Sequence, residues 1–385
     1  MIGQIRRLVM EPDAVDSDTA RRLTRWAEGA GVEVTVDDGR PRSAPQGGRV
    51  PDVVGIDRSK RSLRLTRHVG APLRPCTGRT DSLLCCNLRV VTQVVGCPLD
   101  CSYCILQQYQ NSGEIVVRVD PREILDGVAA ELAREPRRLL RVCTGQVADS
   151  LALEPEVGFA AAAVERFASL QNGVLELKTK TDRVDHLLQL AHGGRTIISW
   201  SLNPADVVDR EEHGSAPLSA RLAAARRAVD AGFMVAFHLD PMVTEDGEPA
   251  PHLELLELLA GAVSPARVAY LSLGTVRFHP AMRRMIAGRF ARSRSVLAEL
   301  LPDVDGKLRL LSPVRVSLYR QVAARARALF PDVFLYLCME PPRVWRQALD
   351  LSCADRGAVE LLLARSLHAR FGLAPCDPRP AAYPE

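Results

Sequence analysis

The stretch from Gly96 to Gln107 constrains the chain most, because it holds three cysteines at Cys-x3-Cys-x2-Cys spacing: Cys97, Cys101 and Cys104. Thiolate is the soft ligand that iron–sulfur clusters take, and three thiolates can hold three irons of a [4Fe-4S] cube. The fourth iron then stays open to a substrate or cofactor. A structural zinc site would need a fourth Cys or His at matching short spacing, and none follows promptly. An odd number of cysteines also argues against a disulfide pattern.

The composition fits an ordinary globular protein, with 385 residues, 47% hydrophobic and 25% charged. This length allows one large α/β barrel with smaller additions. No apolar run reaches the length of a membrane span and the N-terminus lacks a signal pattern, so we expect a cytoplasmic protein that makes no membrane contact. Ten cysteines then indicate metal or redox chemistry. The net charge of +4 is compatible with nucleic-acid binding but does not establish it.

The first 75 residues predict a small N-terminal α/β lobe. Residues 5–10 and 32–36 have the apolar pattern of strands, and residues 17–30 have helical periodicity. Residues 38–48 are rich in Gly, Pro, Arg and Ser and predict a loop.

From residue 88 onward, predicted strands and helices alternate. The strands are 88–95, 139–143, 174–180, 196–202, 233–240 and 268–274, with helices beginning at Asp120 and covering 155–168, 182–191, 219–231 and 252–262. Such repeats predict a parallel sheet, and we expect a partial (β/α)6 TIM-type barrel over residues 76–300. Residues 301–385 predict a C-terminal α/β extension with a hairpin arm at 306–311, helices at 314–330, near Trp345 and at 355–371, a strand at 333–339, and a loose tail from residue 375.

Barrel active sites form at the carboxyl ends of the strands. The polar or thiol side chains at the predicted strand ends are Cys143, Lys180, Ser201, Asn203, His238, Asp240 and Arg277, together with the cysteine loop. Each has an ordinary alternative as a turn cap, a core residue or a surface charge. Their shared location at one rim predicts a site.

The cysteine motif, with Tyr103 just before its third cysteine, is typical of radical S-adenosylmethionine (SAM) enzymes. The chain resembles one family of them, the spore photoproduct lyases, over most of its length. The further matching stretches are Cys143-Thr144-Gly145, Thr179-Lys180, Val184-Asp185-His186-Leu187-Leu188, Ser201-Leu202-Asn203, Val276-Arg277-Phe278 and Leu337-Cys338-Met339-Glu340.

The resemblance implies that the open iron chelates SAM and that one electron, from a flavodoxin- or ferredoxin-type donor, yields a 5′-deoxyadenosyl radical. In the family this radical takes a hydrogen atom from a methylene-bridged thymine dimer in DNA, and a cysteine thiol quenches the thymine radical that remains. The matching thiol is Cys143. A small buried apolar cysteine is the alternative.

The resemblance also implies cofactor contacts. Lys180 and Ser201 match SAM-binding positions, with Asn203 as a companion and Gly145 at a SAM-contacting position that is polar in the family. Ile105 stands where the family has a second tyrosine that relays hydrogen. Among the nearby tyrosines we assign a catalytic role to Tyr103, although it is not equivalent to that residue.

A C-terminal hairpin wedges at the lesion in the family, and residues 306–309 match it. Arg277, Lys307, Arg309 and Arg315 are therefore candidate DNA contacts, although any Arg-rich surface would look the same.

Four other cysteines form an irregular set for which packing or zinc is a better explanation than a second cluster: Cys76, Cys85, Cys86 and Cys338. Two alternatives stay open: a related radical SAM enzyme acting on RNA, a peptide or a small molecule, and a DNA-binding protein with a structural cluster.

Overall fold

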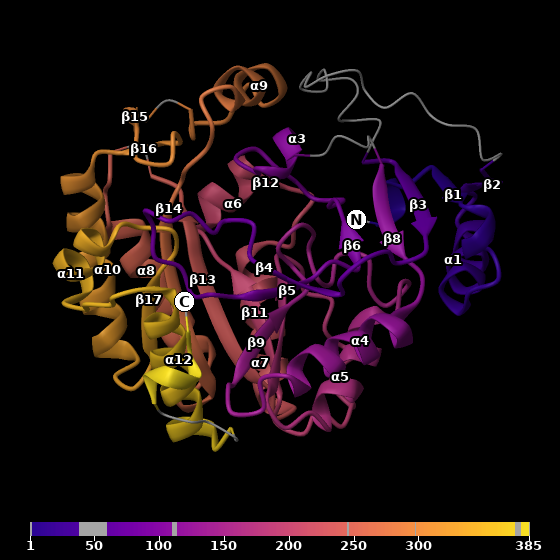
Figure 1. Cartoon of the computed structure of the whole chain (residues 1–385). Coiled ribbons are helices and arrows are strands. Elements are labelled where there is room, and N and C mark those ends of the chain that lie inside the picture. The colour runs from indigo at the N-terminus through magenta and orange to yellow at the C-terminus, as the bar shows by residue number, and fades with distance from the viewer. Residues whose placement is uncertain are drawn as a thin grey trace.

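The computed structural model of the chain describes residues 2–37, 60–109, 114–244, 246–296, 298–373 and 379–384. A curled sheet of eight strands forms the centre, a five-stranded sheet lies beside it, and helices cover the outer face of the curled sheet (Figure 1). The predicted loop at 38–48 and part of the predicted tail lie outside the described residues.

The five-stranded sheet has the order β2-β1-β3-β8-β6. Its strands are β1 (Arg7–Met10), β2 (Glu33–Val36), β3 (Ser62–Thr66), β6 (Val94–Val95) and β8 (Ile115–Arg118). Helix α1 (Asp18–Gly29) begins where the Ser17 hydroxyl accepts a hydrogen bond from the amide of Ala20, and it packs Leu23 and Ala27 into the core. The sheet therefore combines the N-terminal segment with two strands from beyond residue 75.

The curled sheet has the order β17-β14-β13-β11-β10-β9-β5-β4, and only the β4–β5 pair is antiparallel. Its strands are β4 (Leu73–Pro75), β5 (Arg89–Val91), β9 (Leu140–Cys143), β10 (Gly173–Thr179), β11 (Thr196–Ser201), β13 (Met234–Met242), β14 (Val268–Thr275) and β17 (Phe334–Leu337). Strands β9, β11 and β14 are buried on both faces, as expected for a parallel sheet between helices and a filled interior. The predicted partial barrel is confirmed, with β17 as an additional parallel strand.

The two edges of the curled sheet approach each other without forming a continuous ladder. The Leu84 amide, ahead of β5, donates a 3.0 Å hydrogen bond to the carbonyl of Glu340, which follows β17. Across the interior, Arg141 on β9 donates to the Tyr336 hydroxyl on β17 at 3.2 Å. The inward-facing side chains of distant strands can therefore meet, as in a barrel.

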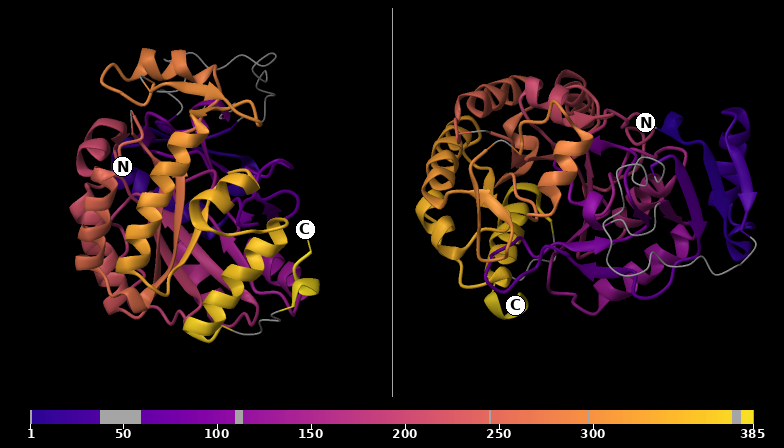
Figure 2. Two further views of the ribbon diagram at one scale, coloured as in Figure 1. Left: turned by 90° about the vertical axis from the view of Figure 1, so that its left-hand side faces the viewer. Right: turned by 90° about the horizontal axis from the view of Figure 1, so that it is seen from above.

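Helices and short elements complete the chain. The helices outside the sheets are α4 (Pro121–Ala133), α5 (Phe159–Ala168), α7 (Leu218–Asp230), α8 (Ala250–Ala262), α10 (Ser312–Leu329), α11 (Pro342–Leu349) and α12 (Arg356–Phe371). At the end where the parallel strands finish lie α3 (Leu106–Tyr109), α6 (Ala205–Glu211), α9 (Met282–Arg289) and the hairpin β15 (Leu300–Pro302)–β16 (Leu308–Leu310), which Figure 2 shows from two further sides. Helices α3, α6 and α9 were not predicted from the sequence. None of the helices in the described ranges combines the length and apolar character that crossing a bilayer requires.

Three local predictions were wrong. The strand expected at 88–95 splits into β5 and β6, which belong to different sheets. The helix expected from residue 155 begins at Phe159, because the Glu154 carboxylate accepts hydrogen bonds from the amides of Gly158, Phe159 and Ala160 and fixes the start there. Residues 182–191 form turns instead of a helix, since the Thr181 hydroxyl bonds locally and competes with helical pairing.

Candidate active site

The cysteine loop lies at the end of the curled sheet where the parallel strands finish, just before α3 (Figure 1). It is anchored by the short strand β7 (Asp100–Cys101), which pairs antiparallel with β12 (Glu212–His213). Next along the loop, the Ser102 amide donates to the carbonyl of Glu211 at 2.8 Å, and the Ser102 hydroxyl donates to the Glu211 carboxylate. The loop is thus held against the segment between β11 and β13.

The three motif cysteines fit a cluster with one thiolate on each of three irons. All are free thiols, and Cys97 and Cys101 are buried. Burial raises the pKa of Cys97 to about 12, and the charges of Asp149 and Cys104 act in the same direction, so Cys104 lies within electrostatic range of Cys97. Among the described residues, no three Cys, His, Asp or Glu side chains converge on a position for a single ion. A [4Fe-4S] cube needs no such point, because each thiolate binds its own iron and loses its proton there.

One buried carboxylate, Glu212, gathers the polar side chains beside this loop. Tyr103 donates its hydroxyl hydrogen to Oε1 of Glu212, and Asn203 donates its amide hydrogen to the same oxygen at 2.9 Å. Lys180 Nζ lies 3.4 Å from Oε1, and Arg221 Nη1 lies 2.6 Å from Oε2. Three residues assigned from the sequence therefore meet at a fourth that was not assigned.

Glu212 stays ionised although it has no exposed surface. Burial alone would raise its pKa, but the Lys180 and Arg221 charges, with the hydrogen bonds from Tyr103 and Asn203, lower the pKa to about 2. The sequence signal was weak, because an adjacent pair of glutamates in a connecting segment is usually exposed. Only the pairing of β12 with β7 brings this carboxylate to the site.

The other predicted cofactor positions lie near this cluster with different environments. Lys180 Nζ is 5.8 Å from the centre of the Tyr103 ring and partly exposed, so its ammonium can reach both Glu212 and a ligand. Ser201 ends β11 and is buried. At Gly145 an added Cβ would lie 2.7 Å from the Ser150 hydroxyl, so this position has no room for a side chain.

Cys143 lies at the end of β9 and faces the interior of the curled sheet. It has no exposed surface, and burial raises the pKa of its thiol, to which the nearby Glu176 charge adds. Its sulfur accepts a 3.3 Å hydrogen bond from the Gly145 amide. Beside it on β10, Glu176 is the register partner of Cys143, and its carboxylate pairs with His238 at 2.8 Å and with Arg141 at 3.4 Å. The thiol is therefore protonated and lies next to a group of buried charged side chains.

His238 and Asp240 lie on β13, as predicted, and both are already paired. Burial lowers the pKa of His238 to about 4, so the imidazole is neutral at pH 7. Asp240 forms a 2.8 Å ion pair with Arg277, whose other terminal nitrogen lies 3.3 Å from the Cys338 sulfur. Arg277 is thus a rim residue that neutralises a buried carboxylate.

The predicted hairpin is present, but its basic side chains are engaged. Arg309 has no exposed surface and pairs with Asp305 at 2.7 Å, while Arg315 is 2% exposed and pairs with Glu340 at 3.0 Å. Lys307 lies 3.3 Å from Asp305. In this arrangement the two arginines fasten the hairpin to the barrel, and Lys307 is the more accessible of the three cations.

Comparison with known proteins identifies the family. A profile of spore photoproduct lyases matches residues 5–301, which is most of the chain. The chain belongs to the spore photoproduct lyase family. It is 25% identical to the spore photoproduct lyase of Bacillus subtilis over 296 residues, covering 75% of this chain and 83% of that protein. A Geobacillus relative is 29% identical over 210 residues, or 53% of this chain, and that match spans 61% of the relative's length.

Solved structures of spore photoproduct lyases share this fold. One variant bound to AdoMet and the dinucleoside spore photoproduct has a TM-score of 0.75 at 21% identity, covering 86% of this chain and 98% of its own. A complex with the dinucleoside spore photoproduct has a TM-score of 0.72 over the same shares. At this identity the likeness establishes the fold.

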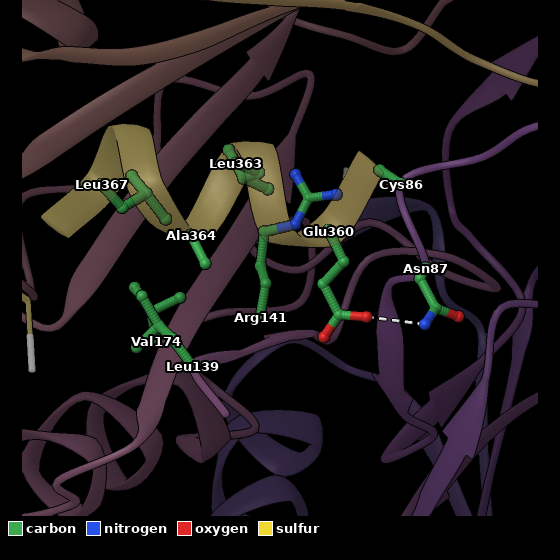
Figure 3. A pocket seen from close by; sticks show the side chains of 9 residues that line it. All are labelled: Cys86, Asn87, Leu139, Arg141, Val174, Glu360, Leu363, Ala364 and Leu367. Atoms are coloured by element: carbon green, nitrogen blue, oxygen red, sulfur yellow. Dashed lines mark hydrogen bonds between the residues drawn. The ribbon is translucent and has the colours of Figure 1, made fainter. Parts of the chain in front are cut away.

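Two further features of this spore photoproduct lyase family member lie outside the cofactor cluster. Burial raises the pKa of the Cys338 thiol and the nearby Cys86 and Cys76 add to this rise, while the Gln146 amide donates to the Cys76 sulfur at 2.8 Å. A small pocket opens at the amino end of the strands, between the start of β9 and β10 and helix α12, where Glu360 accepts a 2.6 Å hydrogen bond from Asn87 (Figure 3). This pocket is at the opposite end of β9 from Cys143.

Proposed function

We propose that the chain is a radical SAM lyase that reverses methylene-bridged thymine dimers in DNA. The observation that carries the proposal is the buried, protonated thiol of Cys143 at the same end of the barrel as the cysteine loop. Family membership supports it, as do solved relatives that hold the dinucleoside spore photoproduct. We do not expect a purely structural cluster, because the family is one of enzymes.

The proposed cofactor residues divide into two groups. Cys97, Cys101 and Cys104 would hold the [4Fe-4S] cluster, which with bound SAM and one electron from a flavodoxin- or ferredoxin-type donor supplies a 5′-deoxyadenosyl radical. Lys180 binds the methionine carboxylate of SAM with the N–H groups that do not face Glu212. Asn203, Ser201 and the Gly145 backbone line the same rim.

Cys143 is the proposed hydrogen-atom donor. After the methylene bridge breaks, its S–H bond breaks homolytically and the hydrogen atom goes to the thymine methyl radical, which leaves a thiyl radical on the sulfur. Donation requires a protonated thiol, and burial, which raises the pKa of Cys143, keeps it protonated at neutral pH. The Gly145 amide holds the sulfur in place.

The proposed DNA-binding face includes the hairpin β15–β16. Its Leu301 and Val304 side chains are 54% and 60% exposed, and such apolar groups can insert between base steps. Lys307 and the rim residue Arg277 would then face the flanking phosphates, while Arg309 and Arg315 support the hairpin. A bonded thymine pair must leave the stack to reach Cys143.

The test is anaerobic turnover of the reconstituted protein with SAM, a reductant and the dinucleotide spore photoproduct. We expect both 5′-deoxyadenosine and free thymidylyl-thymidine. Cys143→Ala should still form 5′-deoxyadenosine while the repair product is diverted to other adducts. The matched control is Cys353→Ala, a buried cysteine ahead of α12, which should behave as wild type. Unchanged products from Cys143→Ala would refute the donor assignment.

Ile105 favours a second candidate, a radical SAM enzyme of the same family acting on RNA, a peptide or a small molecule. This side chain packs against an apolar cluster that includes Tyr103, Phe278 and Met282, and it cannot relay a hydrogen atom. The same assay separates the two functions, because this candidate predicts 5′-deoxyadenosine without lesion reversal.

A further inference from the structure

The chain has only four lysines, and three of them have a carboxylate partner. Lys60 pairs with Asp100 at 2.8 Å, Lys180 with Glu212 at 3.4 Å and Lys307 with Asp305 at 3.3 Å. Within the described ranges, the remaining lysine, Lys178, has no side-chain hydrogen bond or ion pair. Holding a cation on the inner face of a curled sheet without a counter-charge costs free energy, unless a bound ligand supplies that charge.

Lys178 points into the barrel mouth. Alternate residues of a strand share a face, so Lys178 lies on β10 between the inward-facing Glu176 and Lys180. Burial lowers the pKa of His238, and the Lys178 charge lowers it further. The same charge opposes the rise in the pKa of Cys143 that burial causes. The ammonium is therefore within electrostatic range of β9 and β13 at once, and it is only partly buried.

The carboxylates near Lys178 already have other cations. Glu176 is matched by Arg141, and it also accepts hydrogen bonds from His238 and Ser199 at 2.8 Å. Asp240 is matched by Arg277 at 2.8 Å. Two carboxylates thus face three cations when Lys178 is included, since His238 is neutral. A third carboxylate on this side, Asp149, is bound by the Thr179 hydroxyl and the Lys180 amide, so none of the three carboxylates pairs with Lys178.

We propose that Lys178 binds the phosphodiester that joins the two nucleosides of the substrate, an inference that rests on the proposed function. The thymine bases are neutral, so the bridging phosphate is the one anion that a two-base lesion brings to this depth. The ammonium is a compact point charge with three donors, which suits a phosphate oxygen. Lys180, one inward position nearer the rim, is taken by Glu212 and the proposed SAM carboxylate.

The experiment compares two spore photoproduct probes, the dinucleotide with its phosphodiester and the dinucleoside without it. Affinities are measured by calorimetry with the cluster-loaded protein and no reductant, so that no turnover occurs. Wild type should bind the dinucleotide about tenfold to a hundredfold more tightly, as expected for one charge-assisted hydrogen bond. Lys178→Met should bind both probes equally, and Lys178→Arg should restore most of the preference. Arg134→Met, which removes an exposed charge that pairs with Glu131, is the control for net charge.

Three results would be decisive. If Lys178→Met keeps the full preference for the dinucleotide, the inference is wrong and the proposed function stands. If wild type binds both probes equally, no phosphate contact exists. If wild type binds neither probe, the proposed substrate is wrong. In that case undamaged thymidylyl-thymidine should still slow reductive methylation of Lys178, read by mass spectrometry with the other three lysines as internal references, and equal labelling with and without it would overturn the inference.

Discussion

Replacing Glu212 with Gln should destabilise the protein by about 3 kcal/mol at pH 7. The pKa of this carboxylate is about 2 in the folded state against an ordinary value of 4.5, and each unit corresponds to about 1.4 kcal/mol. The variant also turns an amide toward Arg221 and leaves that guanidinium and Lys180 without their counter-charge. Breaking one partner of a buried pair costs about 3–5 kcal/mol, which agrees with the value from the pKa.

The pH dependence separates this electrostatic loss from a packing defect. Because the folded pKa lies below 4.5, the stabilisation by the ionised Glu212 is complete above pH 4.5 and is lost as the pH falls toward 2. The difference in unfolding free energy between wild type and Glu212→Gln should therefore decrease by about 1 kcal/mol from pH 7 to pH 4.

Urea denaturation of the anaerobic, cluster-loaded proteins at both pH values provides the measurement. Glu131→Gln is the matched control, since its ion pair with Arg134 lies on the surface and should contribute less than about 1 kcal/mol. A loss below about 1 kcal/mol for Glu212→Gln at pH 7, or a gap that does not narrow at pH 4, would refute the counter-charge argument.

Two further predictions concern buried groups away from the cofactor residues. Burial lowers the pKa of His252 to about 4, so the unfolded chain takes up its proton first and wild type should lose about 2 kcal/mol of stability from this residue between pH 7.5 and pH 5. His252→Leu should not show this loss in urea denaturation. If the unfolding free energies of wild type and His252→Leu change equally with pH, the assignment to His252 is wrong. Arg315→Met should lower the unfolding free energy by about 3 kcal/mol, because it leaves the buried Glu340 with only the more distant Arg309 guanidinium, 3.9 Å away. A variant that keeps wild-type stability but loses DNA affinity would show that Arg315 contacts phosphate.

The parts of the site that the sequence predicted are those specified by local spacing. Cys97, Cys101 and Cys104 lie within one loop, and Cys143 directly ends an apolar strand, so local sequence spacing was enough to predict where these residues lie in the fold. The alternation of strands and helices predicted the barrel for the same reason. The predicted start of helix α5 was wrong because the Glu154 side chain fixes it, by accepting a hydrogen bond from the amide of Phe159.

The parts that sequence missed depend on contacts between distant segments. Glu212 lies at the centre of the proposed cofactor residues because β12 pairs with β7, more than 100 positions earlier. Arg309 looked like a DNA contact because Arg is usually exposed, yet Asp305, four residues before it, and the fold around the hairpin bury it. No periodicity or composition distinguishes a buried charge from an exposed one.

Three alternate residues along and just after β10 carry charges, and the positions of the carboxylates give each one a different environment. Glu176, at the deepest position, is neutralised inside the barrel by Arg141, and Lys180, nearest the rim, is balanced by Glu212. Between them, Lys178 lies two positions beyond Glu176, the register partner of Cys143, and has no carboxylate partner of its own. An anionic substrate would give Lys178 a counter-charge, whereas a neutral one would leave this partly buried cation without a partner. Under the proposed function, the phosphodiester of the substrate would supply this negative charge, which argues for a nucleotide over a neutral small molecule.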